Sequence, residues 1–584
     1  MLKRFLPILD WLPNYQPGNL KGDLSAGLTV GVMLIPQGMA YAMLAGLPPI
    51  YGLYASTVPL IMYAIFGTSR QLAVGPVAMI ALLIATGVGH LAEPGSDQFV
   101  RLAILLALMV GSIQLLLGLF RLGFIVNFLS HPVISGFTSA AALIIGLSQL
   151  KHLLGIEIPR SSYVHKILID AFDSIEFINL STLAIGLTGI LVIILLKKFQ
   201  KSIPGPLVAV VFGIAAVYLL KLHQMGVKIV QEVPQGLPGF SFPNIDQEAV
   251  SSLMPIALTI ALVGFMESIA VAKAIQSKHK DYQVDANQEL IGLGMANIIG
   301  SLFKSFPTVG GFSRTAVNDQ AGANTGLASI ISAALIILTL LFLTPLFYYL
   351  PQAILASVIM VAVFGLIDFK EAIHLWSTDR TDFYMLLITF LTTLGLGIEQ
   401  GIMVGVVLSL AMVIYRSAYP HIASLGKVPN TNYYRNIERF PQVEQRPDIL
   451  VMRFDAPLFF ANANYFKDKL MQMVQGKGHQ LKLVILNAEA ISTLDSSAVH
   501  MLVECFNEFR TGGIKIYLAG TIGPVRDIMY KSGLIDLIGE NNMFMHVHDA
   551  VAHYDSDSSQ QPLQNKHAVQ TNVERHTTRR MLWD

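Results

Sequence analysis

The stretch Pro49-Ile50-Tyr51-Gly52-Leu53-Tyr54-Ala55-Ser56 runs through an apolar segment to Gly67-Thr68-Ser69-Arg70. The segment from Pro49 to Gly67 is near the length that an α-helix needs to cross a hydrocarbon core of roughly 30 Å. The Ser-Arg pair then marks the point where the helix meets water, before another apolar segment begins. This stretch predicts a chain embedded in a membrane.

The composition of the whole chain supports this prediction. Of its 584 residues, 53% are hydrophobic and only 13% are charged, which excludes an arrangement of ordinary soluble domains. The formal net charge is +1 and the basic residues are scattered, so we expect no nucleic-acid partner. The single cysteine, Cys505, allows no intramolecular disulfide and indicates that its part of the chain faces a reducing compartment.

Apolar stretches recur from Ser25 to Tyr419 and then stop. We predict a cytoplasmic N-terminal segment (1–24), a transmembrane domain (25–419), a linker (420–440), a soluble domain (441–553) and a disordered tail (554–584) that is poor in apolar residues. The transmembrane domain has about fourteen candidate segments, at residues 25–45, 50–67, 75–91, 99–119, 124–150, 180–197, 205–222, 252–273, 287–303, 313–322, 326–348, 352–367, 381–396 and 398–417.

Basic residues between the segments predict the orientation of the chain. They fall on one side of the bilayer if there are about fourteen segments, which places both termini and the soluble domain in the cytoplasm. We expect a multi-pass protein of the cell membrane, with a bacterial inner membrane as the favoured location. The residues concerned are Lys3, Arg4, Lys21, Arg70, Lys197, Lys198, Lys201, Lys273, Lys278 and Lys280.

The two halves of the transmembrane domain resemble each other. Val74-Gly75-Pro76-Val77 opens the short third segment, and Val309-Gly310-Gly311-Phe312 opens the short tenth. Each follows a polar residue, Gln37 or Glu267, in the first segment of its half. An odd number of segments per half inverts the second copy, as in carriers that hold substrate between broken helices. The alternative is chance recurrence of short Gly-containing motifs, and the matching order of segments favours a repeat.

Two half-helices that begin inside the membrane would present unpaired N–H groups and about +0.5 charge each, which favours an anion. Gly75, Gly310 and Gly311 would let an anion approach the backbone closely. Arg314 adds a full positive charge at a depth where a cation needs a partner, a wet cavity or a substrate. The alternative is a structural salt bridge from Arg314 to Glu267.

Glu267 lies in an otherwise apolar run, where a carboxylate is a candidate functional group. Burial favours its neutral form and a nearby cation favours its charged form, and a proton-coupled carrier needs both effects. A structural hydrogen-bonding acid is the alternative. Gln37 and Tyr41, four residues apart, share one helical face and could donate hydrogen bonds to an oxyanion.

These motifs together resemble the SulP family of anion transporters. The resemblance covers Pro36–Ala45, Pro48–Arg70, Val74–Val77, Glu267–Lys273 and Ser313–Asn318. It implies a polytopic α-helical membrane protein, a seven-plus-seven inverted repeat with core and gate domains, which moves anions by an elevator-like displacement of the core.

The resemblance also implies a site formed by Gln37, Tyr41, the Val77 backbone, Glu267, Phe312, Ser313 and Arg314. Some bicarbonate-carrying relatives couple to sodium through hydroxyl groups near an acidic residue. Val271 and Phe312 stand at those positions here, so proton symport is the preferred mechanism.

The soluble part reads as a small α/β domain. Strands are predicted at 449–454, 483–486 and 514–518, with helices near 462–475, 497–511 and 522–533. This pattern resembles the STAS domain that SulP proteins carry at the C-terminus, where it would support a homodimer. Ser496 and Ser497 match a loop that bacterial STAS proteins phosphorylate, although Asp and Ser are also ordinary helix N-caps.

Neither a cofactor nor a metal is predicted, because His546, His548 and His553 fit no zinc pattern. No P-loop or catalytic motif stands out, which argues against an enzyme. The leading hypothesis is proton-coupled sulfate transport, with bicarbonate or dicarboxylate transport, sodium-coupled or by exchange, as the alternative. A nucleobase permease and an anion-sensing membrane receptor are less favoured.

Overall fold

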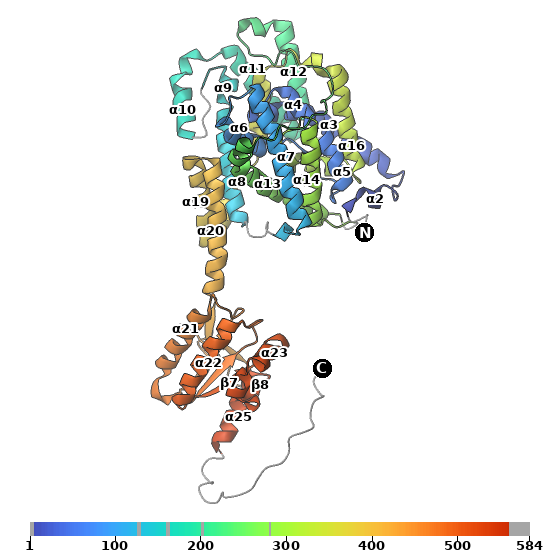
Figure 1. Cartoon of the computed structure of the whole chain (residues 1–584). Helices are drawn as coiled ribbons and strands as arrows, with labels where there is room; N and C mark the ends of the chain where they lie inside the picture. The colour runs from blue at the N-terminus through green and yellow to red at the C-terminus, as the bar shows by residue number, and fades with distance from the viewer. Residues whose placement is uncertain (1–4, 125–129, 159–163, 200–203, 280–281, 560–584) are drawn as a thin grey trace, which may run out of the picture. The chain divides into compact units, whose positions relative to one another are not determined.

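The computed structural model describes residues 5–124, 130–158, 164–199, 204–279 and 282–559, without the side chains of residues 398, 399, 558 and 559. The chain forms two compact units, Met1–Leu410 and Ala411–Asp584. Figure 1 shows the helices of the first unit and the mixed α/β arrangement of the second.

Within the described residues, nine helical stretches are long and apolar enough to cross a bilayer. Five shorter helices stand at the other positions of the fourteen predicted segments. In chain order, the segments are α3 (Asn19–Ala45), α4 and α5 (Pro49–Tyr54, Val58–Phe66), α6 (Ala78–Gly89), α7 (Asp97–Leu119), α8 and α9 (His131–Ser148, Leu150–Leu154), α11 (Leu180–Phe199), α12 (Gly205–Leu220), α13 (Gln247–Gln276), α14 (Ala286–Leu302), α15 (Phe312–Gln320), α16 with a π-helical extension (Leu327–Leu338, Thr339–Leu343), α17 and α18 (Gln352–Phe364, Phe369–Thr378), α19 (Arg380–Leu396) and α20 (Ile398–Ala418).

Several helices begin at the polar residues that precede their apolar runs. The Ser96 hydroxyl accepts a hydrogen bond from the Phe99 N–H at the start of α7, and the Asp246 carboxylate accepts one from the Ala249 N–H at the start of α13. These side chains satisfy N–H groups that have no partner within the helix. A short helix, α10 (Val164–Asp173), was not predicted as a separate element.

The outer face of α11 shows why the first unit needs lipid. Leu187, Leu191 and Ile194 lie three or four residues apart, so they form one stripe along the helix. Each side chain is about half exposed, at 52%, 55% and 48%. An apolar stripe of this kind is unfavourable in water and favourable against acyl chains.

Helix contacts in the first unit occur in matching pairs, as an internal repeat requires. Helix α3 packs against α16 as α13 packs against α7, and α3 packs against α6 as α13 packs against α15. The pair α11–α17 matches the pair α8–α19. Each match relates a segment of the first seven to the equivalent segment of the second seven. Figure 1 shows α7 and α14 side by side near the centre of this unit.

The opening motif of the sequence lies at a close helix contact. A Cβ atom on Gly52 in α4 would overlap the carbonyl of Gly38 in α3. Only glycine allows the two backbones to approach this closely. Gly52 of the opening motif is therefore required by its packing against α3.

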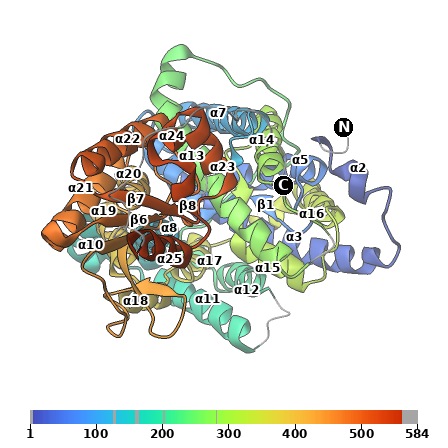
Figure 2. The same ribbon diagram turned by 90° about the horizontal axis from the view of Figure 1, so that it is seen from below.

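The second unit contains a six-stranded sheet with the order β4-β3-β5-β6-β7-β8. Strands β5 to β8 are parallel, whereas β3 pairs antiparallel with β4 and β5. Helices α21 to α24 cover one face and α25 covers the other (Figure 2). The elements are β3 (Ile422–Lys427), β4 (Tyr434–Asn436), β5 (Ile449–Phe454), α21 (Ala463–Lys477), β6 (Leu483–Asn487), α22 (Ser496–Thr511), β7 (Lys515–Ala519), α23 (Gly523–Lys531), α24 (Leu534–Ile538), β8 (Met543–Phe544) and α25 (Val547–Ser559).

The secondary-structure elements of this unit extend beyond the predicted domain at both ends. Residues 420–440 are not a free linker, because β3 and β4 form a hairpin within the sheet. The tail does not begin at residue 554, because α25 continues to Ser559 and buries Tyr554. Arg446 holds this helix by a 2.6 Å ion pair to Asp555. The same guanidinium donates hydrogen bonds to the Asp448 carboxylate, which lowers the pKa of Asp448 below its usual value. Residues 560–584 lie outside the described residues.

Candidate functional site

Two short strands bring the broken segments together at the centre of the first unit. Strand β1 (Val74–Gly75) pairs antiparallel with β2 (Val309–Gly310), with Val74 opposite Gly310 and Gly75 opposite Val309. Helix α6 begins at Ala78 and α15 begins at Phe312, shortly after each strand. The predicted half-helices therefore exist, and the strands that precede them are joined as a two-stranded sheet.

Buried hydroxyl groups fix the two strands to the surrounding helices. The Ser268 hydroxyl of α13 accepts a 2.8 Å hydrogen bond from the Gly310 N–H and donates one to the Gly264 carbonyl. The Thr315 hydroxyl of α15 accepts a 3.0 Å hydrogen bond from the Ala73 N–H. These bonds satisfy backbone groups that could not otherwise be buried without a free-energy cost.

The glycine N–H groups are engaged rather than free. Gly310 donates to Ser268, and the Gly311 N–H donates to the Ala73 carbonyl at 3.1 Å. Phe312, Ser313 and Arg314 form the first turn of α15, where backbone N–H groups have no intrahelical partner. A helix N-terminus of this kind is able to accept an anion.

Arg314 is the centre of this site. Its side chain is 2% exposed. Its Nη1 atom donates a 2.6 Å hydrogen bond to the carbonyl of Pro76, which lies between β1 and α6. Its Nε and Nη2 atoms are buried and have no hydrogen-bonding partner within the described part of the chain. A cation at this depth with unused donors is able to bind an anionic oxygen.

The face of α3 that carries Gln37 and Tyr41 is also buried at this point. Their side chains are 3% and 5% exposed, and the Gln37 Oε1 atom has no partner among the described residues. Helix α15, which carries Arg314, contacts both α3 and α13. The structure thus brings together α3, α13 and α15, the helices that carry these candidate residues.

Glu267 and Arg314 do not form the direct ion pair that was the structural alternative. The Glu267 Oε2 atom is buried without a hydrogen-bonding partner in the described residues, and Arg314 bonds to Pro76 instead. Val77 is the partly buried residue before α6, and Phe312 and Ser313 are exposed at the start of α15. Exposure of these two residues leaves the first turn of α15 open to solutes.

Glu289 is a buried carboxylate that sequence reasoning missed. It is fully buried in α14 and accepts hydrogen bonds from the Tyr63 hydroxyl at 2.6 Å, the Thr68 N–H at 2.7 Å, the Thr68 hydroxyl at 2.6 Å and the Ser69 N–H at 3.1 Å. These bonds fix the end of the opening motif to α14. The isolated acidic residue within the segment 287–303 was the available signal, as it was for Glu267.

In the second unit, Ser496 and Ser497 are exposed at the start of α22. The N-cap is Asp495, whose carboxylate accepts 2.8 Å hydrogen bonds from the Ala498 and Phe460 N–H groups. Neither serine hydroxyl is needed for the cap. Within the described residues, no group of His, Cys, Asp and Glu side chains is arranged to hold a metal ion.

Comparisons with known proteins agree with this architecture. The profile of the Sulfate permease family matches residues 20–389, and that of the STAS domain matches residues 440–550. "Sulfate transporter 4.1, chloroplastic" of Arabidopsis thaliana is 43% identical over 565 residues, covering 93% of this chain and 82% of its own length. "High affinity sulfate transporter 2" of Stylosanthes hamata is 34% identical, with coverages of 95% and 87%.

Solved structures show the same fold over nearly the whole chain. The murine Solute Carrier 26 family member A9 anion transporter, in the inward-facing state, has a TM-score of 0.87 and 28% identity, covering 95% of this chain and 94% of that chain. The transmembrane domain of the cyanobacterial bicarbonate transporter BicA has a TM-score of 0.59 at 23% identity, which shows likeness of fold alone. The family match spans more than half of the sequence and extends through both broken segments. The chain therefore belongs to the sulfate permease family, and it is a multi-pass membrane transporter with a C-terminal STAS domain rather than an enzyme.

Proposed function

We propose that this protein transports an inorganic oxyanion across the membrane, with sulfate as the favoured substrate. The observation that carries the proposal is Arg314, a buried guanidinium with two unused nitrogen donors beside the N-terminal turns of α6 and α15. Oxygen atoms of a tetrahedral anion match planar guanidinium donors and backbone N–H groups. Relatives named as sulfate transporters, which cover most of this chain, support sulfate over other oxyanions.

Proton coupling through Glu267 is the second part of the proposal. Its unpartnered Oε2 atom is buried on α13, a helix that contacts the segment carrying Arg314. A proton on Glu267 would remove a negative charge from the site just when a divalent anion binds, since like charges repel strongly at low dielectric. Val271 is buried near this point and offers no oxygen ligand, so sodium coupling is less favoured.

The transport movement would be an elevator-like displacement of one set of helices against another. The core would comprise α3 to α7 and α13 to α16, and the gate α8 to α12 and α17 to α20. Contacts within each set, such as those of α14 with α7 and of α19 with α8, support this division. The proposal also places both termini in the cytoplasm, the chain in a cell membrane such as a bacterial inner membrane, and two copies in a homodimer supported by the STAS domain.

Uptake of radiolabelled sulfate into proteoliposomes that contain only the purified full chain tests the proposal. Imposing a pH gradient and a sodium gradient separately should show accumulation with the pH gradient. Glu267→Gln should lose this accumulation and keep sulfate-for-sulfate exchange, because its neutral amide cannot release a proton. The matched control is Glu248→Gln, an exposed residue on the same helix, which should behave as the wild type.

Other outcomes would redirect the assignment. No accumulation under either gradient would favour bicarbonate or dicarboxylate transport by exchange. Competition by uracil would favour a nucleobase permease, and an absence of flux for every anion would favour a membrane sensor. Loss of both accumulation and exchange in Glu267→Gln would assign Glu267 a structural role.

A further inference from the structure

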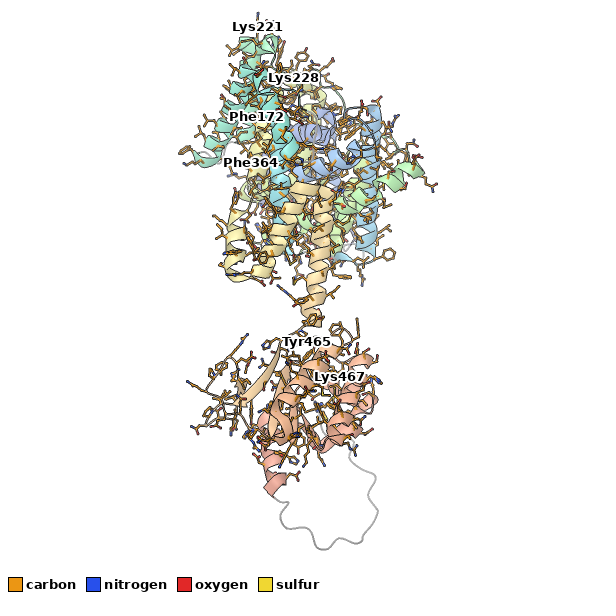
Figure 3. All side chains as sticks on the ribbon, turned by 90° about the vertical axis from the view of Figure 1, so that its left-hand side faces the viewer. Phe172, Lys221, Lys228, Phe364, Tyr465 and Lys467 are labelled. Carbon is orange, nitrogen blue, oxygen red and sulfur yellow. The ribbon has the colours of Figure 1, made fainter. Side chains whose placement is uncertain are left out.

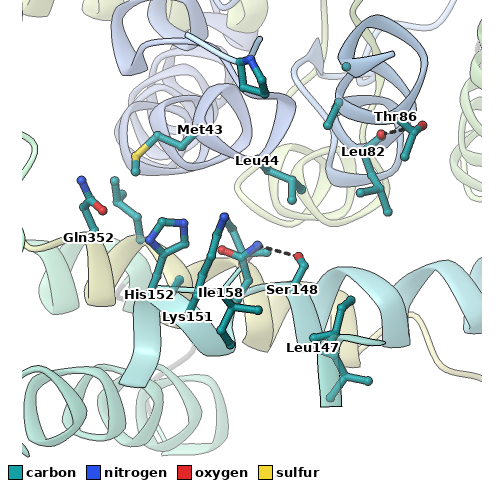
Figure 4. Close-up of a pocket in the computed structure, with 18 of the residues that line it drawn as sticks. Met43, Leu44, Leu82, Thr86, Leu147, Ser148, Lys151, His152, Ile158 and Gln352 are labelled. Atoms are coloured by element: carbon teal, nitrogen blue, oxygen red, sulfur yellow. Dashed lines mark hydrogen bonds between the residues drawn. The ribbon is translucent and has the colours of Figure 1, made fainter. Parts of the chain in front are cut away.

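The second unit contains a cavity of about 380 Å³ at which three arginines meet. Arg435, Arg439 and Arg453 line it, together with His421 and Asp455. Figure 4 shows a cavity of about 350 Å³ in the first unit for comparison, and no arginine occurs among the described residues that line it. Guanidinium groups that gather at one cavity form a candidate site for an anion.

One of the three arginines already has a counterion. Arg453 donates hydrogen bonds to both oxygens of the Asp455 carboxylate, from Nε at 2.6 Å and from Nη2 at 2.9 Å. The ring of His421 lies 2.7 Å from the same carboxylate. Within the described part of the chain, Asp455 is the one carboxylate that lines this cavity, and its charge balances that of Arg453.

The charges of Arg435 and Arg439 are not balanced in this way. Both side chains are exposed, and neither forms a hydrogen bond or an ion pair with any residue that the structure describes. Arginine stays protonated in proteins, so the cavity carries an excess of about two positive charges without a contribution from His421. Phe440, which is 50% exposed, adds an apolar ring to the same lining.

The cavity lies at the edge of the sheet where the chain arrives from the last membrane span. Helix α20 ends at Ala418, and β3 begins at Ile422, which pairs with Phe454 at the end of β5. His421 and Asp455 flank this pair and line the cavity. His421 is three residues beyond Ala418, a separation that the chain can span over at most about 11 Å. The cavity is therefore close to the end of α20.

The end of α20 is also fixed to this edge by side chains. Asn462 Nδ2 donates a 3.0 Å hydrogen bond to the Ser417 carbonyl, and the Tyr419 ring packs edge-on against Tyr465 with centroids 5.2 Å apart. Tyr465, labelled in Figure 3, lies on α21 at the end of the second unit that α20 enters. Tyr415 and Tyr419 are 60% and 56% exposed. Tyrosines at the end of a span are typical of the layer of lipid headgroups.

We propose that Arg435 and Arg439 bind the phosphate groups of anionic phospholipids in the leaflet from which α20 emerges. Guanidinium groups donate paired hydrogen bonds to phosphate oxygens, and basic residues next to a span attract anionic headgroups. Phe440 can contact the boundary between headgroups and acyl chains. The lipid composition then determines how firmly this edge of the STAS domain is held at the membrane, a role separate from the anion site at Arg314.

Fluorescence quenching in lipid nanodiscs tests this contact with the purified full chain. Gln442→Cys places a label in an exposed turn beside Phe440, and the single native cysteine, Cys505, is buried. The nanodiscs contain phosphatidylcholine and a small share of a lipid whose headgroup carries a nitroxide quencher. Replacing phosphatidylcholine stepwise by phosphatidylglycerol should increase the quenching. A label at Gln480→Cys, before β6 at the opposite edge of the sheet, should show no such increase.

Substitution of the two arginines in the labelled chain separates their role from that of general charge. Arg435→Gln or Arg439→Gln should raise the fraction of phosphatidylglycerol needed for half of the quenching change roughly fivefold, and the double variant should lose the response. Arg435→Lys should keep most of it, because the charge remains. Arg510→Gln is the matched control, since Arg510 is an exposed arginine where α22 ends, at the opposite edge of the sheet, and it should respond as the wild type.

Three results would overturn the inference. The wild type could show no response to phosphatidylglycerol, or the double variant could respond as strongly as the wild type. Reversal of the quenching by inorganic phosphate, but not by chloride at equal ionic strength, would assign the arginines to a free anion instead of a lipid. None of these results depends on sulfate transport, which the Arg314 variants test separately.

Discussion

The two broken segments share a backbone plan and differ in charge. Both begin with a two-residue strand and continue as a short helix. The first turn of α6 is Ala78-Met79-Ile80, whereas α15 begins Phe312-Ser313-Arg314. The first helices of the halves differ in the same way, because α3 carries the neutral Gln37 and α13 carries Glu267. The repeat supplies two helix N-termini, and the second half alone supplies the charges.

This asymmetry gives the site a simple charge balance. Two helix N-termini provide about +0.5 each and Arg314 provides +1, so the site holds roughly +2 when Glu267 is protonated. That value matches a fully ionised sulfate. An ionised Glu267 would reduce the sum to roughly +1, which suits a monovalent anion better. A second buried arginine, on α6, would add a further desolvation cost of several kcal/mol without a matching anionic charge.

The strongest effect is expected from removing the only positive charge on the two half-helices, which is Arg314. Arg314→Gln should lower sulfate transport at subsaturating concentration by roughly 10- to 100-fold, because a hydrogen bond to a charged group is worth about 1.5–3 kcal/mol. Initial rates in proteoliposomes, normalised to the amount of reconstituted protein, measure this loss.

Arg314→Lys separates charge from geometry. A lysine retains the positive charge but cannot donate both to the Pro76 carbonyl and in a fork to an anion. We expect activity between that of the wild type and that of Arg314→Gln. Equal activity in the wild type and Arg314→Gln would show that the helix N-termini suffice and that the charge asymmetry has no role in binding.

An intermediate effect is expected from two neighbouring glycines that differ in what a methyl group would meet. A Cβ on Gly311 would lie 2.7 Å from Arg314 Nη2 and 2.8 Å from its Cζ atom, so Gly311→Ala must displace the guanidinium. A Cβ on Gly310 would meet the end of the Leu72 side chain, at 2.6 Å from Cδ1. Leucine can change rotamer, whereas Arg314 is fixed by its bond to Pro76.

Gly311→Ala should therefore lower the affinity for sulfate roughly tenfold, as overpacking costs about 1–3 kcal/mol. Gly310→Ala should affect mainly thermal stability. Competition by unlabelled sulfate and thermal unfolding of the purified protein measure the two effects. If Gly310→Ala reduced affinity as much as Gly311→Ala, the strand as a whole, rather than the position of Arg314, would determine binding.

The candidate residues could be named from the sequence because their signals are local. Charged residues in apolar runs identify Glu267 and Arg314, and the repeated Val-Gly motifs identify the two broken segments. The sequence did not predict that Val74 pairs with Gly310, or that Ser268 and Thr315 bind the strands. Those contacts join residues that are far apart in the chain, and ordinary serines and threonines carry no sign of their partners.

The elements of the second unit that lie outside the predicted domain have a similar explanation. Strand β3 is built from Ile422–Lys427, whose few apolar residues give a weak pattern, and pairing with β5 decides its structure. Helix α25 extends beyond the predicted end of the domain because Tyr554 is buried against the sheet and Arg446 binds Asp555. Local composition cannot show a docking contact of this kind.

The weakest effect is expected from the side-chain hydrogen bonds that hold the two strands, β1 and β2. Ser268 follows Glu267 on α13 and holds β2 of its own half, whereas the residue after Gln37 on α3 is Gly38, which has no hydroxyl. The residue before β1, Ala73, is held instead by Thr315 of the second half. Thr315→Val keeps the shape of the side chain and leaves the buried Ala73 N–H without its acceptor.

Both Thr315→Val and Ser268→Ala should lower the free energy of unfolding by about 1–3 kcal/mol, the cost of a buried donor that has lost its partner. Thr315→Val should also increase hydrogen exchange at Ala73 and Val74, in the first half, although the substitution is in the second. Ser268→Ala should increase exchange at Gly310 and leave Ala73 protected. Exchange mass spectrometry of the purified full chain distinguishes these patterns. If Thr315→Val left exchange at Ala73 unchanged, the first strand would be held by its own half after all, and the dependence of one repeat on the other would be limited to the charges.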